Sequence, residues 1–230
     1  MPSKRTETHP TESGGLSPAV VVGLALSLFG VVALGQVDLP RWVTASATRS
    51  FLTNSLYSWV LVGAILALVV FWERRRIASI GLELPGRGDV AVGIGAGLVA
   101  TVLGLLVTGA AVTLFSLRAP PTLSAIGQLS LPVQVVIVAT AVITEEILWR
   151  GYPIERLTEV TGNVWIAGTV SGLVFLAVHV PGWGLVGAIP QSVFTVVLVG
   201  VYVWRRNVVV TMLTHAVING LVLLVLPAVL

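Results

Sequence analysis

Long apolar runs separated by short polar segments dominate the pattern along the chain. Runs of about 20 apolar residues are typical of helices that cross a bilayer. The pattern predicts seven such helices, at 18–38, 52–72, 89–116, 131–153, 164–180, 185–204 and 208–229. We therefore expect an all-α fold, a polytopic integral membrane helix bundle with about seven transmembrane helices.

The polar segments divide the chain into three parts. Residues 1–16 are rich in Ser, Thr, Pro and Gly, which is typical of a disordered tail. Residues 17–130 are expected to hold the N-terminal transmembrane helices and a cytoplasmic connector that begins with "ERRR" at 73–76. Residues 131–230 are expected to form the functional helical core, because the unusual intramembrane polar residues lie there.

Lysine and arginine set the expected orientation, because they accumulate in the cytoplasmic segments beside membrane helices. With a cytoplasmic N-terminus, ten of them belong to the inner segments: Lys4, Arg5, Arg74, Arg75, Arg76, Arg87, Arg150, Arg156, Arg205 and Arg206. Three belong to the outer segments: Arg41, Arg49 and Arg118. This asymmetry predicts a multi-pass protein of the cytoplasmic (plasma) membrane with its N-terminus inside.

Composition supports the membrane assignment and excludes other classes. Of the 230 residues, 56% are hydrophobic and 10% are charged, whereas soluble domains carry about 25% charged residues. The net charge is only +3 and no nucleic-acid motif is present, so the expected surroundings are a lipid bilayer and no nucleic acid. Without cysteine, disulfides, iron–sulfur clusters and thiol catalysis are excluded. The sequence carries no signal for an oligomeric state.

One apolar run ends in a cluster of charges, "ITEEILWRGY" at 143–152. A charged side chain at bilayer depth costs about 2.5–3.5 kcal/mol on insertion scales and usually has a function. Glu146 and Arg150 are spaced i, i+4, so they can pair on one helix face. That pairing would leave Glu145 less constrained, as a candidate for chemistry.

Two histidines on later spans are expected at the depth of Glu145. With a turn at Gly162, Glu145 lies 17 residues before it and His179 lies 17 residues after it. Equal offsets in an antiparallel helix hairpin give equal heights, about 25 Å from the tip at 1.5 Å per residue. His215 follows the turn at 205–207 and should lie about 12 Å deep. The site is therefore expected to open toward the cytoplasm.

This set of side chains suits hydrolysis. A carboxylate and a neutral imidazole can polarise one water molecule, whose proton the carboxylate then accepts. A second histidine with Asn219, four residues further on, can donate hydrogen bonds to a developing oxyanion. Glu145, His179 and His215 are also a plausible Zn²⁺ set, although no HExxH motif is present.

Three motifs resemble those of a known family. "EEILWR" at 145–150, "FLAVH" at 175–179 and "HAVIN" at 215–219 match EExxxR, FxxxH and HxxxN. These are motifs of the CPBP family of membrane proteases (CAAX prenyl proteases and bacteriocin-processing or immunity proteins, also called the Abi family). The similarity covers roughly residues 130–225, and Trp149 stands where the family usually has phenylalanine. The resemblance implies a membrane-embedded endopeptidase that acts on a membrane-associated protein or peptide, in CAAX-type processing or peptide maturation.

The resemblance also implies the site residues and their roles. It assigns six residues to the site: Glu145, Glu146, Arg150, His179, His215 and Asn219. The first glutamate would activate water, which the first histidine helps to hold. The second histidine and the asparagine would stabilise the oxyanion, and the Glu–Arg pair would shape the site. The family is commonly labelled metalloprotease, while a metal-free glutamate mechanism is argued for the Ras-converting relatives, and this sequence fits either.

Two other functions are compatible with the same residues. One is a non-proteolytic membrane scaffold or bacteriocin-immunity protein that retains the motifs. The other is a proton-coupled transporter that uses Glu145 and the histidines as a relay. The transporter has less support, because the sequence shows no inverted repeat.

Overall fold

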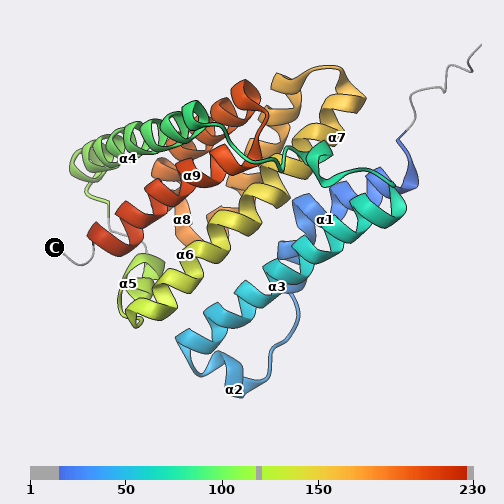
Figure 1. Cartoon of the computed structure of the whole chain (residues 1–230). Helices are drawn as coiled ribbons and strands as arrows, with labels where there is room; N and C mark the ends of the chain where they lie inside the picture. Colours follow the sequence, from blue (N-terminus) through green and yellow to red (C-terminus); the bar gives the residue numbers. More distant parts are fainter. Residues whose placement is uncertain (1–15, 118–120, 227–230) are drawn as a thin grey trace, which may run out of the picture.

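The computed structural model describes residues 16–117 and 121–226, so the expected tail lies outside the described residues except for Leu16. The described residues form helices and connecting segments without a strand, which confirms the all-α prediction. Figure 1 shows the helices packed into a bundle, with α1 and α3 on one side and α4, α9 and α8 on the other.

Six of the described helices are long and apolar enough to cross a membrane. Their elements are α1 (Pro18–Gly35), α3 (Ala47–Ala67) with η1 (Leu68–Trp72), α4 (Arg87–Phe115), α6 (Leu131–Glu145) with η3 (Glu146–Gly151) and α7 (Tyr152–Thr161), α8 (Val164–Arg205), and α9 (Val208–Asn219) with η4 (Gly220–Val225). Three short helices connect them: α2 (Arg41–Thr44), η2 (Ile77–Ile80) and α5 (Pro121–Gly127).

The 42-residue helix α8 contains two antiparallel segments, which correspond to the predicted fifth and sixth spans. Gly184 interrupts the helix with φ 67° and ψ 178°, a conformation that is essentially limited to glycine. Gly168 lies against Val199 and Gly172 lies against Thr195, so the two segments pack side by side in opposite directions. The six helices therefore provide about seven membrane-crossing segments, as predicted.

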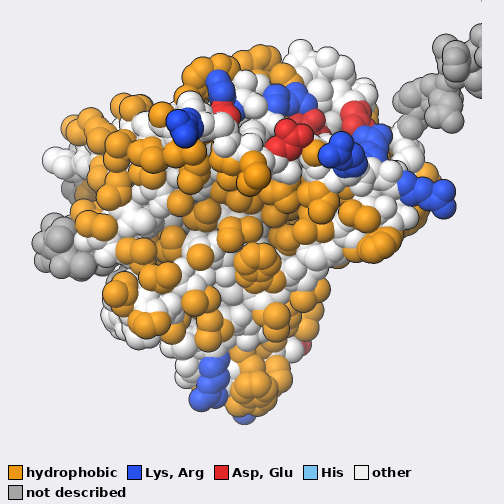
Figure 2. Space-filling model, viewed as in Figure 1, with side chains coloured by type: hydrophobic (Ala, Val, Ile, Leu, Met, Phe, Trp, Pro, Cys, Tyr) orange, Lys and Arg blue, Asp and Glu red, His pale blue; other side chains and the backbone are white. Residues whose placement is uncertain are grey.

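One end of the bundle, here called the arginine-rich end, consists of the connector at 73–86 and the turns at 162–163 and 206–207. Backbone contacts hold these segments together: Val208 N–H donates to the Gly81 carbonyl at 2.8 Å. Asparagine caps begin the helices there, since the Asn163 and Asn207 side chains each accept two backbone N–H groups. Figure 2 shows charged side chains gathered along this edge, above a broad hydrophobic surface.

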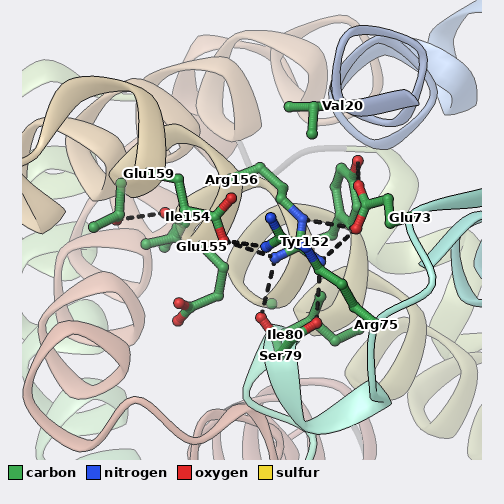
Figure 3. Close-up of polar contacts among 12 residues, drawn as sticks. Val20, Glu73, Arg75, Ser79, Ile80, Tyr152, Ile154, Glu155, Arg156 and Glu159 are labelled. Atoms are coloured by element: carbon green, nitrogen blue, oxygen red, sulfur yellow. Dashed lines mark hydrogen bonds and ion pairs between the residues drawn. The ribbon is translucent and has the colours of Figure 1, made fainter. Parts of the chain in front are cut away.

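A buried ion pair fixes the connector to α7 (Figure 3). Arg156 donates to Glu73 Oε2 from Nη2 at 2.6 Å and from Nε at 2.9 Å, and its side chain is fully buried. The Tyr152 hydroxyl donates to Glu73 Oε1 at 2.7 Å, and Arg156 also donates to the Ser79 hydroxyl at 3.0 Å. The connector is thus tied to the end of the long helix that carries the two adjacent glutamates.

Glycines bring α9 close to α4. Gly93 lies against Leu213 and Gly97 against Val217. A Cβ atom at either glycine would come within 3.0 Å of an atom of α9. Small residues at this spacing permit close packing of membrane helices. The packing fixes α9, and with it the helix face that carries His215, against the rest of the bundle.

Candidate active site

The two adjacent glutamates lie where the helix changes its hydrogen-bonding pattern. Glu145 ends α6, and Glu146 begins the π-helical segment η3, whose six residues are all buried. The Tyr152 N–H donates to the Ile147 carbonyl, five residues back, as a π-helix requires. Such segments occur frequently at functional sites because the wider turn redirects side chains.

Serines from two neighbouring helices stabilise this segment. Pro153 has no N–H, so the turn before it has a carbonyl without its usual helical donor. The Ser27 hydroxyl on α1 donates to the Leu148 carbonyl, and the Ser171 hydroxyl on α8 donates to the Trp149 carbonyl. Both serines are fully buried, so the irregular segment is held by the surrounding bundle.

Glu146 is the centre of a buried polar network. Its Oε1 accepts a hydrogen bond from Arg150 Nη1 at 3.2 Å and from His215 Nδ1 at 2.8 Å. The Glu146 and Arg150 side chains are fully buried. The network thereby joins η3 to α9, and the i, i+4 pair that the spacing predicts is present.

His215 has hydrogen-bond partners at both ring nitrogens. Since Nδ1–H donates to the Glu146 carboxylate, Nε2 is an acceptor, and the Asn219 amide donates to it at 2.9 Å. Asn219 is only half-buried and keeps a second amide hydrogen. In this arrangement Asn219, rather than His215, is the group with a free donor.

Glu145 and His179 form the second group of polar residues. Glu145 Oε1 lies 3.8 Å from His179 Nε2, and both side chains are partly exposed. His179 Nδ1 donates to the Phe175 carbonyl at 2.7 Å, so Nε2 of the neutral ring is an acceptor. Glu145 Oε1 and His179 Nε2 are both acceptors, so neither can donate to the other, and 3.8 Å is beyond hydrogen-bond distance. One water molecule between them can donate a hydrogen bond to each.

Phe175 connects the two groups. Its ring centroid lies 4.1 Å from Cζ of Arg150 on one side and 4.1 Å from the His179 ring centroid. Trp149 packs edge-on against both Phe175 and His179 and is almost fully buried. The aromatic residues therefore orient the imidazole. Sequence reasoning missed this role of Phe175 and Trp149, and the FxxxH motif and the position of Trp149 before the arginine were the available signals.

A cavity of about 690 Å³ lies between α1, α3, α6 and α8. Glu145, His179 and Trp149 line it, while the Glu146 network does not. The six predicted site residues thus fall into a cavity-lining pair and a hydrogen-bonded group of four that does not line the cavity. The cavity extends to Gln36 and Trp183, away from the arginine-rich end. The residues of η3 on the other side of Glu145 are buried. The expectation that the site opens toward the cytoplasm stays a prediction.

The three predicted Zn²⁺ ligands are not arranged as a shared metal site. Across the described residues, which include all three, no group of three or more His, Asp or Glu side chains converges. Glu145 and His179 are neighbours, but both nitrogens of His215 are engaged by Glu146 and Asn219. Zinc would require a free imidazole nitrogen from His215, so these residues do not fit a three-ligand ion.

Part of the chain is similar to a known protein family. Residues 127–221 match the family model described as "Type II CAAX prenyl endopeptidase Rce1-like". The matched region contains all three motifs, from EEILWR to HAVIN. No curated protein and no solved structure matches the chain.

Proposed function

We propose that this chain hydrolyses a peptide bond of a membrane-associated protein or peptide. The match of residues 127–221 to the Rce1-like model of type II CAAX prenyl endopeptidases supports this proposal. The observation that carries the proposal is the Glu145–His179 pair, 3.8 Å apart on the wall of a cavity among the membrane helices. CAAX-type processing and the maturation of a membrane-bound peptide both fit this chemistry.

Glu145 is the general base in the proposed mechanism. Its carboxylate accepts a proton from a water molecule that His179 Nε2 orients by accepting the other water hydrogen. The water oxygen attacks the peptide carbonyl carbon, and a C–O bond forms while the carbonyl π electrons move to oxygen. The protonated Glu145 then gives its proton to the amide nitrogen as the C–N bond breaks, which releases an amine and a carboxylic acid.

The buried network supplies position and a hydrogen-bond donor. We assign the oxyanion of the tetrahedral intermediate to the second amide hydrogen of Asn219, which His215 orients. Since Asn219 does not line the cavity, this role requires the substrate carbonyl to point toward α9. Glu146 and Arg150 hold η3 and α9 in register, so they act through His215 rather than on the substrate. Because the residues do not fit a three-ligand Zn²⁺ site, no step of this mechanism involves a metal.

Replacing the base without changing its size tests the proposal. Glu145→Gln keeps the shape and removes the proton acceptor, so we expect proteolysis to fall by about 10²–10⁴-fold, the usual contribution of general base catalysis. The measurement compares new peptide termini in membranes that contain wild-type or variant protein. Glu83→Gln, the same change at an exposed position in the connector, is the control and should keep wild-type activity.

Unchanged termini in the Glu145→Gln membranes would contradict the proposal. A variant that is folded and abundant but supports the full biological phenotype would instead favour a membrane scaffold or immunity protein that retains the motifs. Measuring protein abundance and thermal unfolding in detergent for both variants separates loss of chemistry from loss of the protein.

A further inference from the structure

Arginines at or beside the arginine-rich end fall into two groups, with and without a carboxylate partner. The ion pairs are Arg75–Glu159, Arg156–Glu73, Arg205–Asp89 and Arg206–Glu155. Arg74, Arg76 and Arg87 are exposed, and their side chains form no hydrogen bond or ion pair with another described residue. Glu83 in the same connector is exposed and likewise has no partner among the described residues. Three unpaired arginines and one unpaired glutamate leave an excess of positive charge on this surface.

Arg74 occupies a backbone position that favours glycine. The Arg75 N–H closes the end of η1 by donating to the Val69 carbonyl at 2.9 Å. This turn places Arg74 at φ 57°, in the left-handed region where a side chain meets steric strain. Arg206 has a similar conformation at the end of α8, with φ 50°, and forms an ion pair with Glu155. The ion pair accounts for arginine at position 206, whereas no described residue accounts for arginine at position 74.

The chain directly before these arginines is apolar and exposed. The helix Ala47–Trp72 is long and apolar enough to cross a membrane. Its last two side chains are aromatic, with Phe71 79% exposed and Trp72 56% exposed. Tryptophan at the end of a membrane helix lies at the level of the lipid headgroups. Figure 2 shows charged side chains along this edge, directly above the hydrophobic surface. Arg74 and Arg76 therefore lie where a bilayer presents its phosphate groups.

We propose that Arg74 and Arg76 bind the headgroups of anionic phospholipids. A guanidinium presents a planar set of N–H donors that matches two oxygens of one phosphate. Arginines beside a membrane helix attract anionic lipids, and a zwitterionic lipid offers less because its own cation offsets the phosphate. A charge that served only membrane insertion could stand at any neighbouring position of the connector. It would not require an arginine at the left-handed position.

Lipid selectivity can be measured on the purified full-length protein without any proteolysis. The protein in a neutral detergent is mixed with equal amounts of phosphatidylglycerol and phosphatidylcholine that have identical acyl chains. It is then re-isolated, and its bound lipids are quantified by mass spectrometry. We expect the wild type to retain phosphatidylglycerol preferentially, and less so at high salt because the attraction is screened.

Removing the two charges should remove this preference. Arg74→Gln combined with Arg76→Gln should lower the ratio of bound phosphatidylglycerol to phosphatidylcholine at least about fivefold, which corresponds to about 1 kcal/mol. Arg41→Gln is the matched control, because Arg41 is an exposed arginine at the opposite end of the bundle. Its lipid ratio should equal that of the wild type.

A glycine substitution separates lipid binding from a structural role. Arg74→Gly should raise the thermal unfolding midpoint in neutral detergent, because glycine adopts the left-handed conformation without strain. The same variant should lower the lipid ratio. Arg74→Lys keeps the positive charge and should keep most of the lipid preference. A lower unfolding midpoint for Arg74→Gly, with an unchanged lipid ratio, would show that the arginine serves the fold and would contradict the proposal.

Three further results would overturn the proposal. The first is an equal lipid ratio for the wild type and the double variant, or no preference for phosphatidylglycerol in the wild type. The second is loss of the preference when inorganic phosphate is added at the concentration of phosphatidylglycerol, since the arginines would then bind a soluble anion. The third is a change from dimer to monomer in the double variant on size-exclusion chromatography, with an unchanged lipid ratio. That result would assign the surface to a second copy of the chain.

Discussion

Glu145 and Glu146 are neighbours in the chain, yet their side chains meet opposite surroundings. The Glu145 side chain is 21% exposed and lines the cavity, whereas that of Glu146 is fully buried between Arg150 and His215. A carboxylate that already accepts hydrogen bonds from two neighbours is a poor acceptor for a water proton. This difference supports the assignment of Glu145 as the base and Glu146 as a positioning residue.

Neutralising Glu146 should therefore affect stability more than neutralising Glu145. Glu146→Gln leaves the Arg150 charge buried without its partner, and breaking a buried pair in this way costs about 3–5 kcal/mol. We expect a clear decrease in the thermal unfolding midpoint in detergent. Glu145→Gln, one residue earlier, is the matched control and should unfold close to wild type.

A second substitution tests the cause of that loss. Adding Arg150→Met to Glu146→Gln removes the unpaired charge and should recover most of the stability, because hydrophobic replacements of buried ion pairs are often neutral. If stability recovers and proteolysis does not, the Glu146–Arg150 pair is needed to position other groups of the site. Equal stability of Glu146→Gln and Glu145→Gln would show that the buried pair does not hold the bundle.

The hydrogen bonds of His215 lead to a prediction about metals. Because Glu146 and Asn219 occupy both ring nitrogens, a bound Zn²⁺ would have to displace one of them. We expect proteolysis to persist after removal of metal by a chelator and dialysis, as measured by the rate of substrate cleavage with total zinc determined in the same sample. Loss of activity that added Zn²⁺ restores would contradict this arrangement of His215.

Sequence spacing was informative at this scale where one helix or one hairpin was involved. The i, i+4 rule gave the Glu146–Arg150 pair, and equal offsets from Gly162 brought Glu145 and His179 to the same height. The bond from His215 to Glu146 joins residues 69 positions apart, on helices whose rotation no local pattern defines. That contact, and with it the occupation of His215, could not be predicted.

At the scale of elements, η3 depends on donors from other helices. Pro153 has no backbone N–H, so the preceding turn lacks one hydrogen-bond donor. The Ser171 hydroxyl donates to the Trp149 carbonyl of that turn. Ser171→Ala should destabilise the protein by about 1–3 kcal/mol, the cost of a buried group without its hydrogen bond. The thermal unfolding midpoint in detergent measures the effect.

Restoring the missing N–H tests this explanation. Pro153→Ala supplies a backbone donor to the same turn, so Ser171→Ala should cost less in the Pro153→Ala background than in the wild type. Ser192→Ala is the control, because Ser192 is exposed and its hydroxyl donates within α8. Equal effects of Ser171→Ala in both backgrounds would mean that Pro153 is not the reason for the serine.

The lengths of the apolar runs predicted which segments can cross the membrane, but they located the ends of these segments less accurately. The fifth and sixth predicted spans are the two halves of α8, whose helical hydrogen bonding continues almost through the reversal. Pro181 and Gly184 mark the place of the reversal in the sequence, and Gly184 adopts there a positive φ that glycine tolerates. The π-helical turn of η3 was also not predicted, because its serine donors come from distant segments.

For the whole molecule, the ion pair between Glu73 and Arg156 holds the connector against the bundle. Glu73→Gln removes the closer carboxylate partner of the fully buried Arg156 and leaves it only Glu159, at 3.3 Å, so the connector should open more often. We expect trypsin to cleave at Arg74–Arg76 at least about tenfold faster, which corresponds to 1.4 kcal/mol. The rate is followed by fragment analysis of the purified protein in detergent.

A matched variant controls for the change in charge. Glu83→Gln alters an exposed carboxylate in the same connector, and its cleavage rate should equal that of wild type. If the two variants are cleaved at the same rate, the connector is held by its backbone contacts to α9 rather than by the ion pair.

The one-sided cavity also changes the electrical profile of the membrane around this protein. Solvent that reaches Glu145 carries the potential of one compartment into the bilayer, so the remaining voltage falls across the closed layer formed by η3 and α7. Moving one unpaired elementary charge across that layer would change its electrostatic energy by about 2.3 kcal/mol per 100 mV of membrane potential. Glu146 and Arg150 lie in that layer with opposite formal charges, and a pair without net charge experiences almost no force along the field. The buried pair thus places two ionic side chains in this layer with little net coupling to a membrane potential.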